Sequence, residues 1–283
     1  MGITSSARRT TRRAAIAGIA TALTVGGMVG ATGGSAQAAS STATYDCNTL
    51  LGSFPIPISL VTDALTSAVP TGAVVPSDLI PVAGLATLPE TLLSALSGLG
   101  LTSLGATISN FNLLAGDTVL PLDGLTAATT NLPGTGSLDL PVTGTLGGFT
   151  VPLPGLYDIS LPTSFDMLPL GGLLPTITCV LDPSTNPVLG QLNVLKQTSS
   201  TSGAVVKAGR KYTARATVVR QLGLPGTGSV TAKLGKKTLA SKNLSSAGTA
   251  AFKLPKNARG KKLTLVYSGD TLTNGSKTAL RVK

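Results

Sequence analysis

Apolar and polar residues alternate along several short segments in the last third of the chain. Between Lys211 and Val218, every second residue is apolar and the others are basic residues or threonines. The same alternation recurs at 230–234, 250–254 and 263–267, with glycine or proline between the segments. A period of two places one face of a strand in a core and the other in solvent. Short strands at this spacing predict a two-sheet sandwich.

The preceding part of the chain has short apolar runs that are broken by glycine and proline. Segments 107–113 and 151–154 predict irregular strands, whose prolines are confined to edges, strand ends or bulges. Residues 88–96 predict one short helix, with Pro89 in its first turn and glycines shortly after it. Three leucines of this helix are expected to face a sheet: Leu92, Leu93 and Leu96.

The first residues have the pattern of a secretory signal peptide. Four arginines between Arg8 and Arg13 precede the apolar run 14–31, and small residues at 35–39 predict cleavage between Ala38 and Ala39. A retained anchor helix is the alternative, but Gly and Thr dilute the apolar run. The paired arginines also allow twin-arginine export, although the general secretory route is favoured. We therefore expect a secreted protein without a membrane span after cleavage.

Charge divides the remaining chain into two parts. Residues 39–195 contain ten acids and no Lys or Arg, whereas 196–283 contain eighteen Lys and Arg and the single acid Asp270. The predicted domains are therefore 1–38, 39–195 and 196–283. The polar stretch 197–203 is either a brief linker or the first strand of the last domain. The predicted fold class is all-β: two β-sandwich domains, with one short helix in the first, after the signal peptide.

The basic residues of the last domain form two clusters, 233–242 and 253–262. Cations on one face attract polyanions, so anionic cell-wall polymers are a candidate partner. A solvated face, or docking against the acidic domain, explains the same charges. Nucleic acid is not expected as a physiological partner, because the chain is exported and lacks interleaved aromatic residues. The candidate polyanion-binding residues are Lys233, Lys236, Lys237, Lys242, Lys253, Lys256, Arg259, Lys261 and Lys262.

The two cysteines, Cys47 and Cys179, predict a disulfide. No histidine and no Cys-x-x-Cys spacing accompany them, and the chain is expected outside the cell. A bond that closes so long a loop stabilises a fold by about 4 to 5 kcal/mol in the chain-entropy model.

The absence of histidine removes most familiar catalytic arrangements. Ser/His/Asp and Cys/His nucleophile systems and the usual zinc sites all require it. Asp158 with Asp166, or Asp117 with Asp123, form the remaining route to a glycosidase, but scattered acids usually lie in solvent. No loop carries the alternating acids of a calcium site. We predict no catalytic residue, no cofactor and no metal site, and we expect a protein that is not an enzyme.

The sequence Leu-Pro-Gly-Thr-Gly occurs twice, at 132–136 and at 224–228. Sortases cut the pattern Leu-Pro-x-Thr-Gly when an apolar tail and basic residues follow it. The chain ends soon after a predicted strand instead, so both copies are interpreted as turns.

The second part of the chain resembles the bacterial Ig-like domains of exported envelope proteins, over about 196–283. The resemblance rests on 206–212, on 225–230 and on Tyr267-Ser268-Gly269-Asp270. The family pattern places an aromatic residue shortly after the Gly-Asp, where this chain has 271–274 without one. The resemblance implies a spacer or adhesive module and names no ligand.

The first part resembles an actinobacterial secreted domain of unknown function with terminal cysteines. Tyr45-Asp46-Cys47 opens it, and 178–183 closes it with Cys179. No activity comes with this resemblance.

Two functions follow from the sequence. The first is a non-enzymatic structural or adhesive protein, secreted or associated with the cell wall and held there by its basic domain. The alternative is a secreted binding protein whose first domain accommodates an apolar or carbohydrate ligand. The alternative requires an apolar pocket within residues 45–185, and a closed sandwich without a pocket would exclude it. The sequence sets no oligomeric state.

Overall fold

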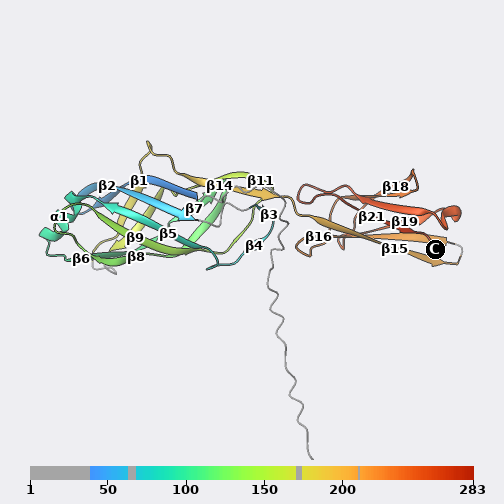
Figure 1. The fold of residues 1–283 in the computed structure, drawn as a ribbon, viewed down its shortest axis with the longest axis horizontal. Coiled ribbons are helices and arrows are strands. Elements are labelled where there is room, and N and C mark those ends of the chain that lie inside the picture. Colours follow the sequence, from blue (N-terminus) through green and yellow to red (C-terminus); the bar gives the residue numbers. More distant parts are fainter. Residues whose placement is uncertain (1–38, 63–67, 170–173, 210) are drawn as a thin grey trace, which may run out of the picture. The chain divides into compact units, whose positions relative to one another are not determined.

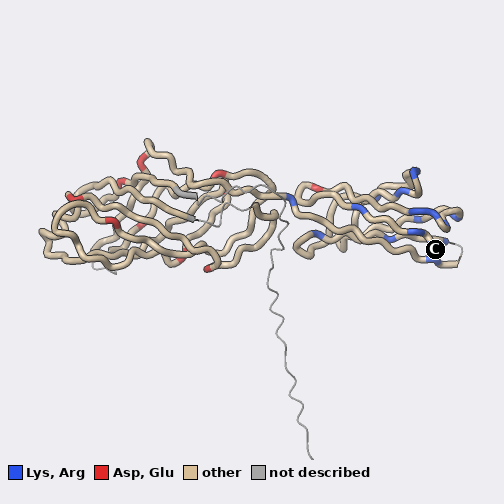
Figure 2. Tube along the Cα trace, viewed as in Figure 1, with Lys and Arg blue, Asp and Glu red and all other residues tan. Residues whose placement is uncertain are grey.

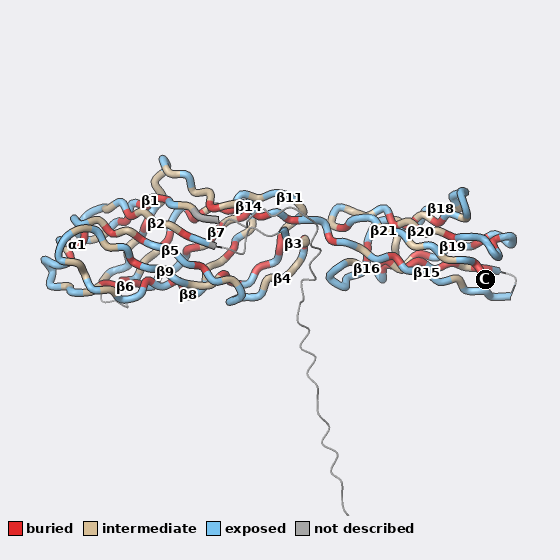
Figure 3. The backbone as a smooth tube through the Cα atoms, viewed as in Figure 1, coloured by how far each residue is buried: buried red, intermediate tan, exposed pale blue. Residues whose placement is uncertain are grey.

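The computed structural model describes residues 39–62, 68–169, 174–209 and 211–283. The predicted signal peptide and its cleavage point lie outside these residues. Within the described part of the chain, no helix is both long and apolar enough to cross a membrane. The buried residues form two separate apolar clusters, one between Ala43 and Val194 and one between Tyr212 and Val282 (Figure 3). We call 39–195 the first module and 196–283 the second module.

The first module contains fourteen strands and one helix among its described residues (Figure 1). The longer strands are β1 (Ala39–Thr49), β2 (Gly52–Thr62), β5 (Pro81–Leu88), β6 (Ser103–Ser109), β8 (Thr118–Asn131), β9 (Leu138–Leu146), β11 (Gly155–Ser160), β12 (Ser164–Pro169) and β14 (Val188–Leu195). The shorter ones are β3 (Val69–Pro70), β4 (Val74–Val75), β7 (Asn112–Ala115), β10 (Phe149–Thr150) and β13 (Ile177–Leu181).

Eight of these strands close into a barrel-like sheet. Their order is β8, β6, β12, β13, β1, β2, β5 and β9, and β9 pairs back with β8 through partners such as Ala127 and Val142. Strands β7, β11, β14 and β3 extend the sheet from β8. The prediction of a sandwich for this module is therefore not borne out. Alternation shows which side chains face inward, but it is the same in a sandwich and in a closed sheet, so only the pairing of β8 with β9 distinguishes them.

The helix α1 (Glu90–Gly98) lies at one end of the closed sheet (Figure 1). Pro89 precedes it in an extended conformation, and the helix ends before Gly100, whose φ of +80° favours glycine. The three leucines expected to face the sheet, Leu92, Leu93 and Leu96, are all buried. The predicted helix and its buried face are confirmed.

The predicted disulfide is present and joins two neighbouring strands of the closed sheet. Cys47 on β1 and Cys179 on β13 are direct register partners, 132 residues apart in sequence, and both are fully buried. Beside them, Tyr45 packs against Phe165 with a ring-centroid distance of 5.0 Å and donates a hydrogen bond of 2.8 Å from Oη to the Pro162 carbonyl. Burial raises the pKa of the Tyr45 hydroxyl. The bond and the aromatic pair thus tie β1 to β12 and β13.

The second module consists of two sheets that share one core. One sheet contains β15 (Ser199–Ala208), β16 (Lys211–Arg220) and β19 (Thr249–Leu254), in that order. The other contains β18 (Lys237–Asn243), β17 (Ser229–Leu234), β20 (Lys262–Tyr267) and β21 (Ser276–Arg281), in that order. A short 3-10 helix, η3 (Lys256–Ala258), lies between β19 and β20.

The alternating segments of the sequence correspond to strands of this module. In β16, Tyr212, Ala214, Ala216 and Val218 are buried, as the alternation predicts. Because β15 begins at Ser199, most of the polar stretch 197–203 belongs to a strand. This stretch is predicted to be either a brief linker or the first strand of the last domain, and the structure shows a strand.

Asp270 is the centre of a polar cluster that joins two loops of the second module. Its carboxylate lies 3.2 Å from the guanidinium of Arg220, and it accepts hydrogen bonds from the Thr227 hydroxyl and, at 2.9 Å, from the Leu272 amide. Burial acts to raise the pKa of Asp270, but these hydrogen bonds and the charge of Arg220 outweigh it and hold the pKa below its usual value. Thr227 belongs to the second Leu-Pro-Gly-Thr-Gly copy, which this cluster anchors to Arg220 and Asp270.

Removal of the disulfide is expected to destabilise the first module. In the double variant Cys47→Ala/Cys179→Ala, the unfolded chain regains the freedom of the long loop, and the free energy of unfolding falls by about 4 to 5 kcal/mol. Urea unfolding of residues 39–283 followed by near-UV circular dichroism measures the change. Reductant should lower the stability of the wild type and leave the variant unaffected. Equal stability of the wild type and the variant would contradict the prediction.

Replacement of Asp270 by Asn is expected to destabilise the second module in a pH-dependent way. A carboxylate whose pKa is lower in the folded chain stabilises the fold above its unfolded pKa, which is about 3.9, and this contribution is lost as the pH falls through the folded pKa. Asp270→Asn should therefore cost about 1 to 3 kcal/mol at pH 7 and progressively less below pH 4.

Hydrogen exchange of the backbone amides in β17 and β20, at pH 7 and at pH 3, measures the stability of the second module alone. Asp117→Asn, in the exposed turn between β7 and β8, is the control and should leave the stability of the second module unchanged at both pH values. A loss of stability that is equal at both pH values would show that the charge of Asp270 does not matter.

Candidate functional site

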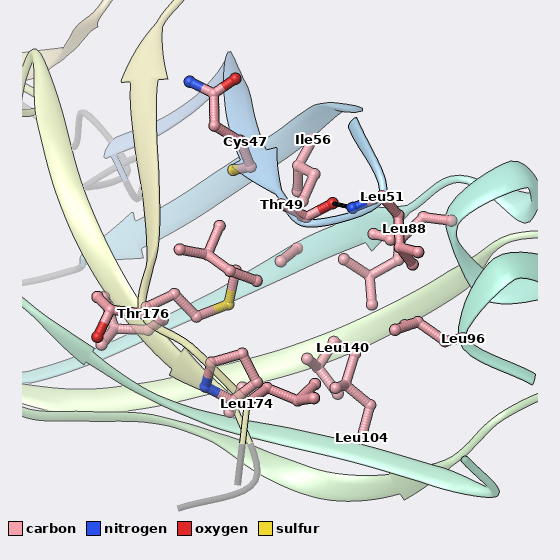
Figure 4. Close-up of a pocket in the computed structure, with 18 of the residues that line it drawn as sticks. Cys47, Thr49, Leu51, Ile56, Leu88, Leu96, Leu104, Leu140, Leu174 and Thr176 are labelled. Atoms are coloured by element: carbon pink, nitrogen blue, oxygen red, sulfur yellow. Dashed lines mark hydrogen bonds between the residues drawn. The ribbon is translucent and has the colours of Figure 1, made fainter. Parts of the chain in front are cut away.

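An apolar cavity of about 250 Å³ lies inside the first module, next to α1 (Figure 4). Its walls are inward-facing side chains of the closed sheet, including Ile58 on β2, Leu104 on β6 and Leu140 on β9. Leu92 and Leu96 of α1 cover one side. Since the wall residues come from many strands around the ring as well as from α1, the cavity exists only when the sheet is closed.

The cavity arises where inward positions carry small side chains. Ala86 on β5 and Ala127 on β8 are buried and line it, although each contributes only a methyl group. An eight-stranded closed sheet has an interior that side chains nearly fill or that holds one small ligand. Two alanines in such an interior leave unfilled space, whereas leucines at the same positions would occupy it.

The lining is almost free of polar groups. Among the described residues that line the cavity, none is charged, and polar side chains come only from Asn48, Thr49 and Thr176. The Thr49 hydroxyl already donates a hydrogen bond of 2.8 Å to the Gly52 carbonyl and accepts one from the Leu51 amide. Apolar cavities bind apolar molecules.

Exposed leucines border the cavity where it reaches the surface. Leu50 and Leu51, between β1 and β2, are 83% and 40% exposed, and Leu99, directly after α1, is 61% exposed. All three belong to the lining, so the cavity opens at the end of the sheet that α1 covers. Exposed apolar side chains around an opening are typical of a ligand-binding site.

The disulfide supports this site structurally. Cys47 is part of the lining, and its bond to Cys179 holds β1 against β13. The first residue of β13, Ile177, also lines the cavity. The prediction of a disulfide was therefore correct, but the sequence did not show that it borders a cavity. The hint that the sequence carries is the presence of small residues, Ala86 and Ala127, at inward-facing positions of β5 and β8.

The predicted polyanion-binding residues lie in the second module, and all nine are exposed. Eight of them lie at one end of that module. Lys242 does not, because it is five residues farther along β18 from Lys237 and its amino group lies 5.9 Å from the centre of the Phe252 ring. The structure therefore gathers most of the predicted set and separates one member from it.

The acids considered for glycosidase chemistry do not line the cavity. Asp158, on β11, accepts a hydrogen bond of 2.9 Å from the Gln191 amide, and Asp166, on β12, accepts one of 2.8 Å from the Asn110 amide. Asp117 and Asp123 are exposed. Among the described residues, no group of three or more His, Cys, Asp or Glu is placed to hold a metal ion.

Both Leu-Pro-Gly-Thr-Gly copies lie between strands. The copy at 132–136 connects β8 to β9, and the copy at 224–228 lies between β16 and β17. The first copy contains a bend at 134–136, in agreement with its interpretation as a turn, whereas the second follows the turn at 221–222 and pairs back with β16 through Pro225 and Val219.

The solved structures that match this chain are distant from it. A Corynebacterium diphtheriae protein named as membrane anchored has 14% identity and a TM-score of 0.40, over 86% of this chain and 58% of that one. A Lactobacillus rhamnosus β-glucuronidase has 11% identity and a TM-score of 0.25, over 89% and 45% of the two chains. A Ruminococcus gnavus β-glucuronidase has 10% identity and a TM-score of 0.24, over 87% and 44%. This chain spans about half the length of these proteins, and the TM-scores are too low to bear on its activity.

Among curated proteins, none matches the chain. A family model does match, over residues 44–190, which is most of the first module and just over half of the chain. The match begins just before Tyr45 and extends beyond Cys179, so it includes both cysteines and every wall of the cavity. The sequence resemblance to a secreted domain of unknown function with terminal cysteines falls on the same residues. The chain therefore belongs to DUF6801, a family of unknown function.

Proposed function

We propose that this chain is a non-enzymatic binding protein whose first module takes up an uncharged, apolar molecule such as an alkyl chain. The observation that carries the proposal is the cavity of about 250 Å³ with its apolar lining. An engineered cavity of about 150 Å³ lined by Leu, Ile and Phe binds benzene. A larger cavity of the same chemistry suits a short alkyl chain or a small ring system.

The same lining argues against a carbohydrate. Each sugar hydroxyl that loses water without a new hydrogen-bond partner costs about 1 to 3 kcal/mol. The cavity offers three polar side chains, Asn48, Thr49 and Thr176, and one aromatic ring, Phe165. Of the two ligand classes expected for the first module, the apolar one is therefore our proposal.

We further propose that the protein works outside the cell and that its second module is a bacterial Ig-like domain. The buried disulfide supports an oxidising compartment. Sheets of three and four strands around one core match the strand count of a constant-type Ig domain. The structural or adhesive role expected from the sequence stays a prediction, and the binding role is preferred because it has a defined site.

Filling the cavity is expected to abolish the binding of an apolar probe. In the variants Ala86→Leu and Ala127→Leu, the added carbons occupy the space a ligand would take, and because they fill an existing cavity, the stability of the first module stays equal or rises. N-phenyl-1-naphthylamine, an uncharged fluorophore, reports binding by fluorescence. We expect saturable binding to the wild-type chain and at least a tenfold weaker affinity in each variant, which corresponds to about 1.4 kcal/mol.

Ala83→Leu is the matched control, because Ala83 is exposed on the same strand as Ala86. It should bind the probe like the wild type. If one filled variant does not fold, the other decides the result, and urea unfolding identifies which variants are folded. Unchanged probe binding in a folded, filled variant would show that the cavity is not the site.

A further inference from the structure

The topology of the second module brings basic residues from distant parts of the sequence to one end. Figure 2 shows Lys and Arg, in blue, concentrated at the end of this module where the C-terminus lies. The adjoining ends of β15 and β16, the turn between β17 and β18, the connection that contains η3, and the residues after β21 all meet there. We call this surface the basic end. It consists of the predicted cations other than Lys242, joined by Lys207, Lys211, Arg281 and Lys283.

The strand register fixes this arrangement. Lys262 is the direct partner of Arg281, and the amide of Gly235, in the turn beside Lys236, donates a hydrogen bond of 2.8 Å to the Lys262 carbonyl. In the other sheet, Lys207 is the partner of Tyr212, and its amino group lies 5.9 Å from the centre of that ring.

The connection after β19 joins the ends of the two sheets. Within it, Ala258 is fully buried in the shared core. The Gly260 amide donates a hydrogen bond of 2.7 Å to the carbonyl of Val282, the residue before the last one. The cations of both sheets therefore form one surface whose backbone is held by hydrogen bonds.

No acid of the second module neutralises the basic end. Asp270 is the single acid of 196–283, and it is paired with Arg220. It follows the last residue of β20, Tyr267, whereas the basic end includes the first residue of that strand, Lys262. Six residues of strand separate them by roughly 20 Å, about two Debye lengths at 0.1 M salt.

The composition of the basic end selects among polyanions. Ten of its twelve cations are lysines, which bind phosphate as point charges without the fixed two-point geometry of Arg, so they suit a flexible polymer better than one rigid phosphate arrangement. Its aromatic residue, Tyr212, is buried, so it offers no ring on which nucleic-acid bases stack.

Insertion into a bilayer is also a poor fit. Among the exposed large apolar residues of the second module, Val206 lies beside the basic end, whereas Val219, Leu222 and Leu224 lie around the turn that contains Arg220. A surface that holds a membrane by insertion needs several apolar side chains among its cations. The basic end instead suits an anionic polymer in solution or in a hydrated wall.

We propose that the basic end binds a linear, phosphate-bearing polymer by charge. Twelve exposed cations on adjoining strand ends and turns present repeated point charges, and a flexible polymer places successive phosphates against them while it releases counterions. This site is separate from the cavity of the first module and does not depend on the proposed apolar ligand.

The test measures binding of fluorescently labelled long-chain inorganic polyphosphate to residues 39–283 over a series of NaCl concentrations. The variant Lys236→Gln/Lys261→Gln/Lys262→Gln removes three charges from the basic end. The matched control, Arg215→Gln/Lys242→Gln/Lys277→Gln, removes three exposed charges from the strand faces. Both variants carry the same net charge.

We expect the first variant to bind at least tenfold more weakly at low salt and the control to stay within about threefold of the wild type. The slope of log K against log salt should fall by about 2 in the first variant, since each phosphate contact on a single-stranded polymer contributes roughly 0.7. Binding of N-phenyl-1-naphthylamine should be unchanged in both variants, which separates this test from that of the cavity.

Three results would overturn the proposal. Equal weakening in the two variants would mean that net charge alone attracts the polymer. Unchanged binding in the first variant would place the site elsewhere. Binding to phosphatidylglycerol vesicles without binding to polyphosphate would assign the basic end to a membrane surface.

Discussion

The first module depends on the pairing of β8 with β9, which closes eight strands into a ring. The pairing runs through Leu122 and Leu146 and through Ala127 and Val142. In an open sheet, both strands would have a free edge, and their inward faces would need a second layer to cover them. Closure gives those faces a common interior instead. A cavity within the sheet is therefore a consequence of closure combined with small residues at two inward positions.

The few aromatic residues decide where in this interior the space remains. Tyr45, Phe111 and Phe165 pack together, with ring-centroid distances of 5.0 to 6.4 Å, and occupy the part of the interior beside β12 and β13. Toward α1, the inward positions carry aliphatic residues and alanine. Aromatic side chains are the largest that a core can bury. Because only 3% of the residues of this chain are aromatic, part of the interior of the closed sheet is left without a large side chain. The cavity lies between this aromatic cluster, whose Phe165 ring forms part of its lining, and α1, whose leucines close the other end only in part.

Local features were predictable from the sequence, and features that depend on distant pairing were not. The buried face of β16, the three leucines of α1 and the bond between Cys47 and Cys179 follow from periodicity, helix signals and cysteine count. Closure of the sheet and the resulting cavity depend on partners that no local pattern shows. The basic end shows the same limit within one strand: Lys237 and Lys242 belong to one basic cluster of the sequence, but the five positions of extended chain between them span roughly 16 Å. Conversely, Lys207 and Arg281 are distant in sequence, yet both belong to the basic end.

The two proposed sites draw on different physical forces, and this difference follows from how charge is divided along the chain. The cavity lies in a module without a single Lys or Arg, and its lining is apolar, so the affinity for a ligand comes from removal of apolar surface from water. Salt leaves this hydrophobic contribution to the affinity nearly unchanged or strengthens it. The basic end works by charge alone, and salt weakens it. A chain built in this way can exchange an apolar ligand without releasing its polymer, and it can leave the polymer in high salt with its ligand still bound. Binding at the two sites is therefore expected to be independent, since a site without charge has no electrostatic means of sensing the other.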